Sequence, residues 1–276
     1  VCDLIEKNNI YANASIYHIL GYTVEEIQAM EPWMMSTLIH PENLIKMPDY
    51  LQQVETGSEG DIFEIEYRIR HKDGSWRWMV SRDTVFAKTA EGKLKQILGT
   101  ATDITESKQA EDEIKLLLAA TQAISQSADF HSALPDILRL LCNAIGWNFA
   151  EAWIPTANGT FLEHSETWYA SDRDLETFGR ESKKIRFAAG VGVPGRIWST
   201  RNVEWIEDIS LATNHLFARS QMAASVGLKA CFAVPIHASS KVLAVLVFCK
   251  RDRSIMEPRI VELVKAVATQ LGDHIQ

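Results

Sequence analysis

Apolar and charged residues alternate strictly over residues 63–70, FEIEYRIR, which predicts a half-buried antiparallel strand. An Asp-Gly turn follows, and residues 76–86 and 94–104 continue as two further strands. Three consecutive strands joined by short turns form an antiparallel meander. Ahead of them, residues 14–56 contain short helical pieces interrupted by glycine and proline.

A helical period replaces the strand pattern at residues 106–127, where apolar residues recur at alternating spacings of four and three. This is the seam of a coiled coil of roughly two heptads, and it equally fits one helix packing on its own domain. The second half then alternates between helices and strands. Its predicted helices are at 131–146, 214–225 and 257–275, and its predicted strands are at 149–154, 161–168, 230–237 and 242–249. These patterns predict an α+β chain of two domains, each an antiparallel sheet flanked by helices, joined by a long helix.

The apolar seams of the long helix and of the last helix are candidate contacts between two copies of the chain. The seam residues are Ile114, Leu117, Ile124, Ile260, Val264, Val267 and Leu271. We expect a parallel homodimer that uses both helices.

The composition narrows the choice of partners and compartment. The chain has 276 residues and a net charge of -8, from 36 acidic and 28 basic residues. An acidic chain is a poor match for nucleic acid or an anionic membrane. The most apolar run, 242–249, is far shorter than the ~20 residues of a membrane helix. Four scattered cysteines without zinc spacing predict no metal site and fit the reducing cytoplasm.

No pattern of residues predicts catalysis in this segment. The run from Gly190 to Gly195 is a literal GxGxxG, but the helix after it can extend only to about Thr200. A dinucleotide-binding crossover needs a longer helix and an acidic residue ~20 positions on. The GxSxG, HExxH and Walker motifs do not occur in the sequence. We therefore assign no catalytic residue and expect no enzyme activity from this segment.

The first hundred residues carry a series of motifs in a specific order. They are NIYANA at 9–14, LGYTVEE at 20–26, HPEN at 40–43, Tyr67-Arg68, Lys72-Asp73-Gly74, Arg77-Trp78 and GTATDIT at 99–105. Together they cover nearly all of residues 1–105 and resemble a PAS domain that lacks its first helical segment.

The second half carries looser motifs, and these resemble a GAF domain. They are GVPGR at 192–196, WIED at 205–208, GLKA at 227–230, VPI at 234–236 and VLAVL at 242–246. The expected organisation is a PAS domain at 1–105, a linker or coiled-coil helix at 106–128 and a GAF domain at 129–276. This order is similar to the sensory region of bacterial multi-sensor histidine kinases, which implies a two-component phosphorelay with the kinase domain beyond residue 276.

The resemblance implies that each domain holds a small molecule or a partner between its sheet and its helices. Candidate pocket residues in the PAS domain are Tyr50, Ile65, Tyr67 and Trp78, and those in the GAF domain are Trp153, Trp168, Trp198, Phe217 and Met222. The aromatic residues of the second half also fit an ordinary core. In PAS families the closing DIT triplet ties the last strand to the hairpin turn. Carried over, Asp103 and Thr105 would contact Lys72 and Asp73 and relay the signal, although Asp103 could also cap the next helix.

Missing motifs argue against two covalent cofactors. Flavin-binding PAS domains place a cysteine in an Asn-Cys-Arg context, and the only cysteine of residues 1–105 is Cys2. Bilin-binding GAF domains carry Cys-His where this chain has Ala218 and Arg219. Haem in the GAF domain stays open because His215 lies near the expected pocket, so the cofactor is unknown.

Two functions from different classes therefore remain. The first is a sensory input and relay region of a cytoplasmic sensor histidine kinase, and the second is a dimerisation or interaction scaffold that binds no ligand. Large aromatic residues favour the scaffold, because they can fill a small cavity with side chains.

Overall fold

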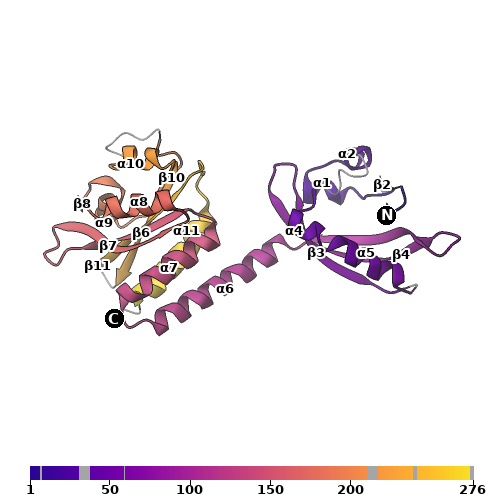
Figure 1. The fold of residues 1–276 in the computed structure, drawn as a ribbon, viewed down its shortest axis with the longest axis horizontal. Helices are drawn as coiled ribbons and strands as arrows, with labels where there is room; N and C mark the ends of the chain where they lie inside the picture. Colours follow the sequence, from indigo (N-terminus) through magenta and orange to yellow (C-terminus); the bar gives the residue numbers. More distant parts are fainter. Residues whose placement is uncertain (7, 31–37, 59, 211–216, 239–240, 274–276) are drawn as a thin grey trace. The chain divides into compact units, whose positions relative to one another are not determined.

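The computed structural model describes residues 1–6, 8–30, 38–58, 60–210, 217–238 and 241–273. The chain divides into two compact units, Val1–Asp112 and Glu113–Gln276 (Figure 1). The division falls inside one helix, α6 (Thr105–Gln126), close to the start of the predicted linker at residue 106.

An antiparallel sheet organises the first unit. Among the described residues its strand order is β2-β1-β5-β4-β3. The strands are β1 (Cys2–Asp3), β2 (Asn8–Asn9), β3 (Phe63–Arg70), β4 (Trp76–Lys88) and β5 (Leu94–Asp103). The helices are α1 (Ser15–Leu20), α2 (Val24–Ala29), α4 (Pro41–Leu44) and α5 (Met47–Thr56). The predicted meander is β3 to β5, and the alternation of FEIEYRIR persists along the whole of β3.

Local sequence signals explain where these helices begin and end. Thr23 accepts a hydrogen bond from the backbone of Glu26, whose side chain accepts one from the backbone of Thr23, which is a reciprocal capping box at the start of α2. Gly21 ends α1 with a left-handed φ of 75°. One face of α5 is buried through Tyr50 and Val54 and packs on β3 and β4.

A second antiparallel sheet organises the other unit, with the order β8-β7-β6-β11-β10-β9 in the described ranges. The strands are β6 (Phe149–Pro155), β7 (Phe161–Ala170), β8 (Arg186–Ala188), β9 (Glu204–Ile206), β10 (Ala230–Ala238) and β11 (Lys241–Lys250). The helices are α7 (Phe130–Ile145), α8 (Arg173–Ser182), α9 (Gly192–Thr200), α10 (Ser220–Ser225) and α11 (Pro258–Asp273). The antiparallel α+β architecture predicted for both domains is confirmed.

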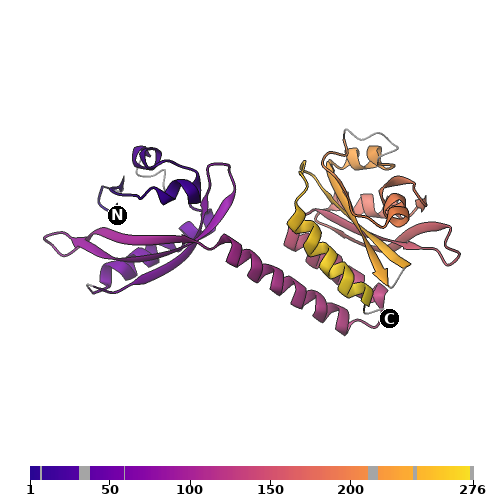
Figure 2. The same cartoon turned by 180° about the vertical axis from the view of Figure 1, so that it is seen from behind.

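Helices cover both faces of this second sheet, as Figures 1 and 2 show from opposite sides. On one face α7, α11 and the last turns of α6 pack over a core that includes Leu138, Phe232 and Val267. On the other face α8, α9 and α10 pack over a core that includes Trp153 and Phe187. The apolar residues of β11 are buried toward both faces, which explains its uninterrupted apolar run.

Candidate functional site

An irregularity in β7 creates the most unusual polar site of the second unit. Glu151 pairs with Trp168 and Trp153 pairs with His164, so residues 165–167 of β7 lie opposite a single residue of β6. Within this bulge Glu166 has a φ of 67°, which is rare for a residue other than glycine. Its backbone N–H donates to Nδ1 of His164 at 3.0 Å. The bulge therefore fixes the His164 ring beside Glu151.

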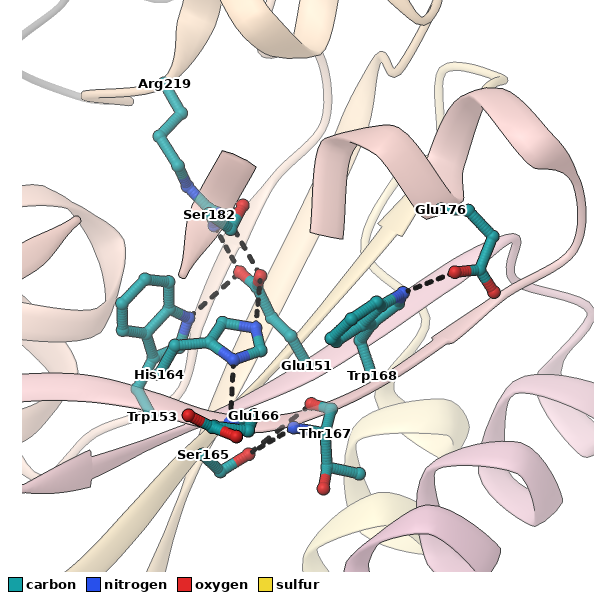
Figure 3. Close-up of polar contacts among 10 residues, drawn as sticks. All are labelled: Glu151, Trp153, His164, Ser165, Glu166, Thr167, Trp168, Glu176, Ser182 and Arg219. Carbon is teal, nitrogen blue, oxygen red and sulfur yellow. Dashed lines mark hydrogen bonds and ion pairs between the residues drawn. The ribbon is translucent and has the colours of Figure 1, made fainter. Parts of the chain in front are cut away.

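Glu151 lies on the central strand β6 and is completely buried, and three side chains surround its carboxylate (Figure 3). Trp153 Nε1 donates to Oε1 at 2.9 Å, and Arg219 donates to both oxygens, with 3.0 Å from Nη1 to Oε2. The Nε2 atom of His164 lies 3.5 Å from Oε2. The two-pronged contact with Arg219 is the geometry that pairs a guanidinium with a carboxylate most strongly.

Arg219 reaches this carboxylate from the residue that precedes α10. Its Nη1 also donates to Ser182 Oγ at 2.6 Å, at the end of α8. Four aromatic rings lie around its guanidinium carbon, at 5.3 Å for Trp153, 5.0 Å for Phe178, 5.9 Å for Phe187 and 5.7 Å for Phe217. Such distances permit cation–π attraction, so charge, hydrogen bonds and rings all hold the guanidinium.

The surrounding groups keep this buried pair charged. Burial raises the pKa of the Glu151 carboxyl group, but the Arg219 guanidinium and the His164 ring more than offset it and lower that pKa to about 2. Burial likewise lowers the pKa of Arg219, and the charge of Glu151 more than offsets it, so that this pKa lies above its usual value. Because Nδ1 of His164 accepts the Glu166 N–H, Nε2 is the ring nitrogen that faces Glu151.

The five predicted pocket residues of the second domain lie in or against one core. Trp153 and Phe217 are buried in it, while Trp168, Trp198 and Met222 are half-buried and pack against it. This core is the helix-covered face that contains the Glu151–Arg219 pair. That these residues contact a ligand stays a prediction. The sequence analysis did not identify Glu151, His164 and Ser182. It named Arg219 only as a position where bilin-binding GAF domains carry a different residue. The four residues are far apart in the sequence, so no local pattern joins them.

Three of the four pocket candidates in the first domain lie where α5 packs on the sheet, Tyr50 on the helix and Ile65 and Tyr67 on β3. Tyr50 donates its hydroxyl hydrogen bond to Asp83 Oδ2 at 2.6 Å, and Tyr67 and Ser81 share a hydrogen bond of 3.1 Å. Ile65 packs in the same cluster as Tyr50. Burial raises the pKa of Asp83, and the Tyr50 hydroxyl only partly offsets that rise.

Trp78 does not belong with these pocket candidates, and its assignment is corrected. It pairs with Arg68, one residue out of step with the pair Tyr67 and Met79, so it lies on the opposite face of the sheet. Its half-buried ring lies 5.1 Å from the guanidinium carbon of Arg68 and 5.6 Å from Lys108 Nζ. Lys108 also pairs with Glu66 at 2.6 Å. Trp78 therefore helps hold the first turns of α6.

The DIT triplet makes different contacts from those expected. Thr105 Oγ1 accepts the backbone N–H of Trp78 at 2.9 Å, and Asp103 Oδ1 accepts the N–H of Thr105 at 2.8 Å. Lys72 instead pairs with Glu26 at 2.6 Å, and Asp73 accepts the N–H of Ser75 at 2.8 Å. The strand register explains why the expected contact is not made. Asp103 of β5 lies opposite Met79 of β4, whereas the turn that contains Lys72 and Asp73 lies beyond Trp76, several residues further along.

The predicted dimer seam is also corrected in part. Ile124, Val264, Val267 and Leu271 are at most 4 % exposed, because they pack into the core of the second unit. Side chains buried this way are unavailable to a second chain. Leu117 and Ile260 are half-buried against the same core, whereas Ile114 is 60 % exposed. Leu118, one turn after Ile114, is 65 % exposed and was not predicted.

The four cysteines, His215 and the acidic side chains bear on the remaining cofactor expectations. Cys2, Cys142, Cys231 and Cys249 are unpaired, and burial raises the pKa of the first three thiols, which disfavours the reactive thiolate. His215 lies outside the described residues. In the part of the chain that the structure describes, no three His, Cys, Asp or Glu side chains gather as metal ligands. In the same ranges no helix has the length and apolar character to span a membrane.

Two sheets of this order, each with its own helices, define a chain of the PAS–GAF sensory class. Residues 9–101 match the family described as "PAS fold", and residues 127–276 match the family described as "GAF domain". The second match covers more than half of the chain, so the chain belongs to the GAF domain family, with a PAS-fold segment ahead of its GAF domain.

Individual relatives are consistent with this assignment. The chain is 26% identical over 267 residues to a protein called "Methyl sulfide methyltransferase-associated sensor" from Methanosarcina acetivorans. That match covers 93% of this chain and 25% of the relative, so this chain spans about a quarter of the relative's length.

Solved structures similar to the chain show the fold alone. The GAF domain of a phosphoenolpyruvate-protein phosphotransferase from Coxiella burnetii has a TM-score of 0.51 at 17% identity, covering 60% of this chain and 94% of that one. A free methionine-R-sulfoxide reductase from Neisseria meningitidis, in complex with its substrate, has a TM-score of 0.49 at 15% identity, covering 61% and 90%.

Proposed function

We propose that this chain is the sensory input and signal-relay region of a cytoplasmic sensor histidine kinase that works in a two-component phosphorelay. In this proposal, binding of a small molecule or a partner biases the arrangement of the helices in a parallel dimer. The expected coupling between input and output is ~1–3 kcal/mol. The PAS–GAF order supports the sensory role, and the name of the Methanosarcina acetivorans relative is consistent with it.

The observation that carries the relay is the set of contacts made by α6. Its first residues bond to the PAS sheet, through Thr105 to the backbone of Trp78 and through Lys108 to Glu66. Its later residues Leu116, Ala120 and Ile124 are buried in the GAF core. A change at the exit of the PAS sheet would therefore act on a helix whose other end is part of the GAF core.

The contact between two copies is proposed for the exposed apolar residues of α6. Ile114 and Leu118 are 60 % and 65 % exposed and lie one helical turn apart. Sedimentation velocity tests this contact, because Leu118→Glu would place a charge in it and shift the chain to monomer. Gln122→Glu adds the same charge on the next turn without removing an apolar group, and should remain a dimer. A wild-type monomer at high concentration would contradict the proposal.

The kinase assignment needs the full-length parent protein. Incubation of the parent protein with labelled ATP should give acid-labile phosphohistidine. The variant Lys108→Ala should change the amount of phosphohistidine that is formed. A parent protein without any phosphorylation would contradict the kinase assignment and leave the sensory role of the two domains to be judged by binding.

A second function, a scaffold that binds no ligand, is favoured by one specific observation. The helix-covered interior of the GAF unit is filled by its own side chains, including the Arg219–Glu151 pair and the ring of Trp153. Native mass spectrometry of the purified chain separates the two functions. A copurified small molecule supports the sensor, and a chain that binds no compound in a metabolite screen supports the scaffold.

A further inference from the structure

The interior of the GAF unit holds the Arg219 guanidinium in a way that resembles the binding of a ligand. The groups that receive it are the carboxylate of Glu151, the hydroxyl of Ser182 and four aromatic rings. We call these six residues, Glu151, Trp153, Phe178, Ser182, Phe187 and Phe217, the cation cage. Figure 3 shows Arg219 extending toward Glu151 from a separate part of the chain.

Most of the cage is built without the segment that supplies Arg219. Glu151 and Trp153 belong to β6, Phe178 and Ser182 to α8, and Phe187 to β8. Glu151 and Ser182 have no exposed surface, and their position depends on the sheet and on α8. Arg219 precedes the short helix α10, in which Ala223 is the buried residue. The cage can therefore keep its shape while its occupant changes.

The chemistry of the cage selects a positive ion that carries N–H groups. The carboxylate of Glu151 supplies a full negative charge, and together with Ser182 Oγ it offers three oxygen atoms that accept hydrogen bonds from Arg219. The rings add cation–π attraction, which is stronger in a desolvated site. An anion would instead be repelled by the buried carboxylate.

We propose that the cation cage is a binding site for a small organic cation with N–H donors, an alkylguanidinium or alkylammonium ion, and that Arg219 occupies it in competition with that ligand. The inference rests on the proposed sensory function for its biological role, because ligand binding would release Arg219 and with it α10. Binding itself does not depend on that role.

Substitution of the occupant tests the site directly. The full 276-residue chain carrying Arg219→Ala should bind methylguanidinium, measured by quenching of tryptophan fluorescence and by the rise in melting temperature. A tethered side chain competes at an effective concentration on the order of millimolar, so the variant should bind at least about tenfold more tightly than the wild type. Tetramethylammonium, which has no N–H groups, should bind more weakly than methylguanidinium.

The matched control is the double variant Arg219→Ala with Glu151→Gln, in which the cage is empty and uncharged. It should show no saturable response to methylguanidinium, and it also corrects for any general denaturing effect of the ion. If the single variant folds poorly, its refolding yield with methylguanidinium is compared with the yield in sodium chloride of equal ionic strength. An equal response of single and double variants, or no rescue of refolding, would overturn the proposal.

The test distinguishes this inference from the proposed function. Saturable binding by Arg219→Ala supports the cage even if the chain is a monomer or its parent has no kinase activity. Loss of the dimer on Leu118→Glu concerns the relay and leaves the cage unaffected, because Leu118 is exposed on α6.

Discussion

The two sheets of this chain differ in how many of their faces are covered and in what they bury. Helices cover both faces of the GAF sheet, and its interior holds a charged pair, Glu151 and Arg219. The PAS sheet exposes polar pairs such as Glu64 and Arg82 on one face, and its helix-covered side holds a tyrosine–carboxyl hydrogen bond at Asp83. A buried full charge therefore needs a partner charge and hydrogen bonds to its polar atoms, while one hydrogen bond suffices for a group at the edge of burial.

The largest effect is expected from breaking the buried ion pair. Glu151→Gln would leave the Arg219 guanidinium buried without its counter-charge, so the free energy of unfolding of the GAF unit should fall by about 3–5 kcal/mol. Urea unfolding followed by tryptophan fluorescence measures this loss. The matched control is Glu163→Gln, which removes an exposed pair with Arg186 and should cost less than about 1 kcal/mol. Equal losses would contradict the account of the buried pair.

A smaller loss is expected where a backbone approaches a glycine. A Cβ on Gly272 of α11 would lie 1.9 Å from the carbonyl oxygen of His237 on β10. Gly272→Ala should therefore push helix from sheet and cost about 1–3 kcal/mol.

Gly99 of the PAS sheet is the comparison, because its added Cβ would meet the side-chain oxygen of Asp83, which can move. Thermal unfolding should show a smaller loss for Gly99→Ala. A larger loss at Gly99 would show that the Asp83 side chain is fixed more firmly than this comparison assumes.

The two buried carboxyl groups should respond to pH in opposite directions. The folded pKa of Glu151 is lowered to about 2 from 4.5, so its stabilisation is complete above the ordinary pKa and is lost as the pH falls toward 2. The folded pKa of Asp83 is raised above its ordinary 3.8, so the folded state binds the extra proton and stability falls as the pH rises through that raised pKa.

Urea unfolding of variants at a series of pH values isolates these two contributions. The loss caused by Glu151→Gln should be largest near neutral pH and shrink on acidification. Relative to the wild type, Asp83→Asn should raise the free energy of unfolding more near neutral pH than in acid. The reason is that the amide resembles the protonated carboxyl group. A loss at Glu151 that is independent of pH, or a benefit at Asp83 that grows in acid, would contradict the assigned directions.

The smallest effect is expected at the junction between β5 and α6. Thr105→Val keeps the side-chain shape but removes the acceptor of the Trp78 N–H, which should cost about 0.5–1.5 kcal/mol in the PAS unit. Thr102→Val, at an exposed position of β5, serves as the control in thermal unfolding. An equal change for both variants would indicate that the Thr105 hydrogen bond contributes nothing measurable.

Periodic patterns predicted the fold well because they report local geometry. The alternation of residues 63–70 gave β3 with its bounds, and the apolar run at residues 242–249 lies within β11. The five GAF pocket candidates lie in or against one core, and their contact with a ligand stays a prediction.

Contacts between distant segments were beyond the reach of those patterns. Glu151 and Arg219 are 68 residues apart, and the bulge at Glu166 that orients His164 leaves no mark in hydrophobic periodicity. Trp78 lies on the face opposite Tyr67 and Met79, as the alternation along β4 implies, and so does not join the other pocket candidates. Val264, Val267 and Leu271 of α11 face the sheet and not a second chain, and an apolar stripe looks alike in the sequence in either case.

Amide hydrogen exchange along α6 tests the central claim most directly, namely that the exit of the PAS sheet is coupled to the GAF core through this helix. The comparison is between the wild type and Thr105→Val, which alters only the PAS end. The account predicts faster exchange both at residues 105–112 and at residues 116–124, with β10 and β11 unchanged. Faster exchange confined to residues 105–112 would contradict the coupling. It would show that a change at the PAS end of α6 is not transmitted to the GAF core.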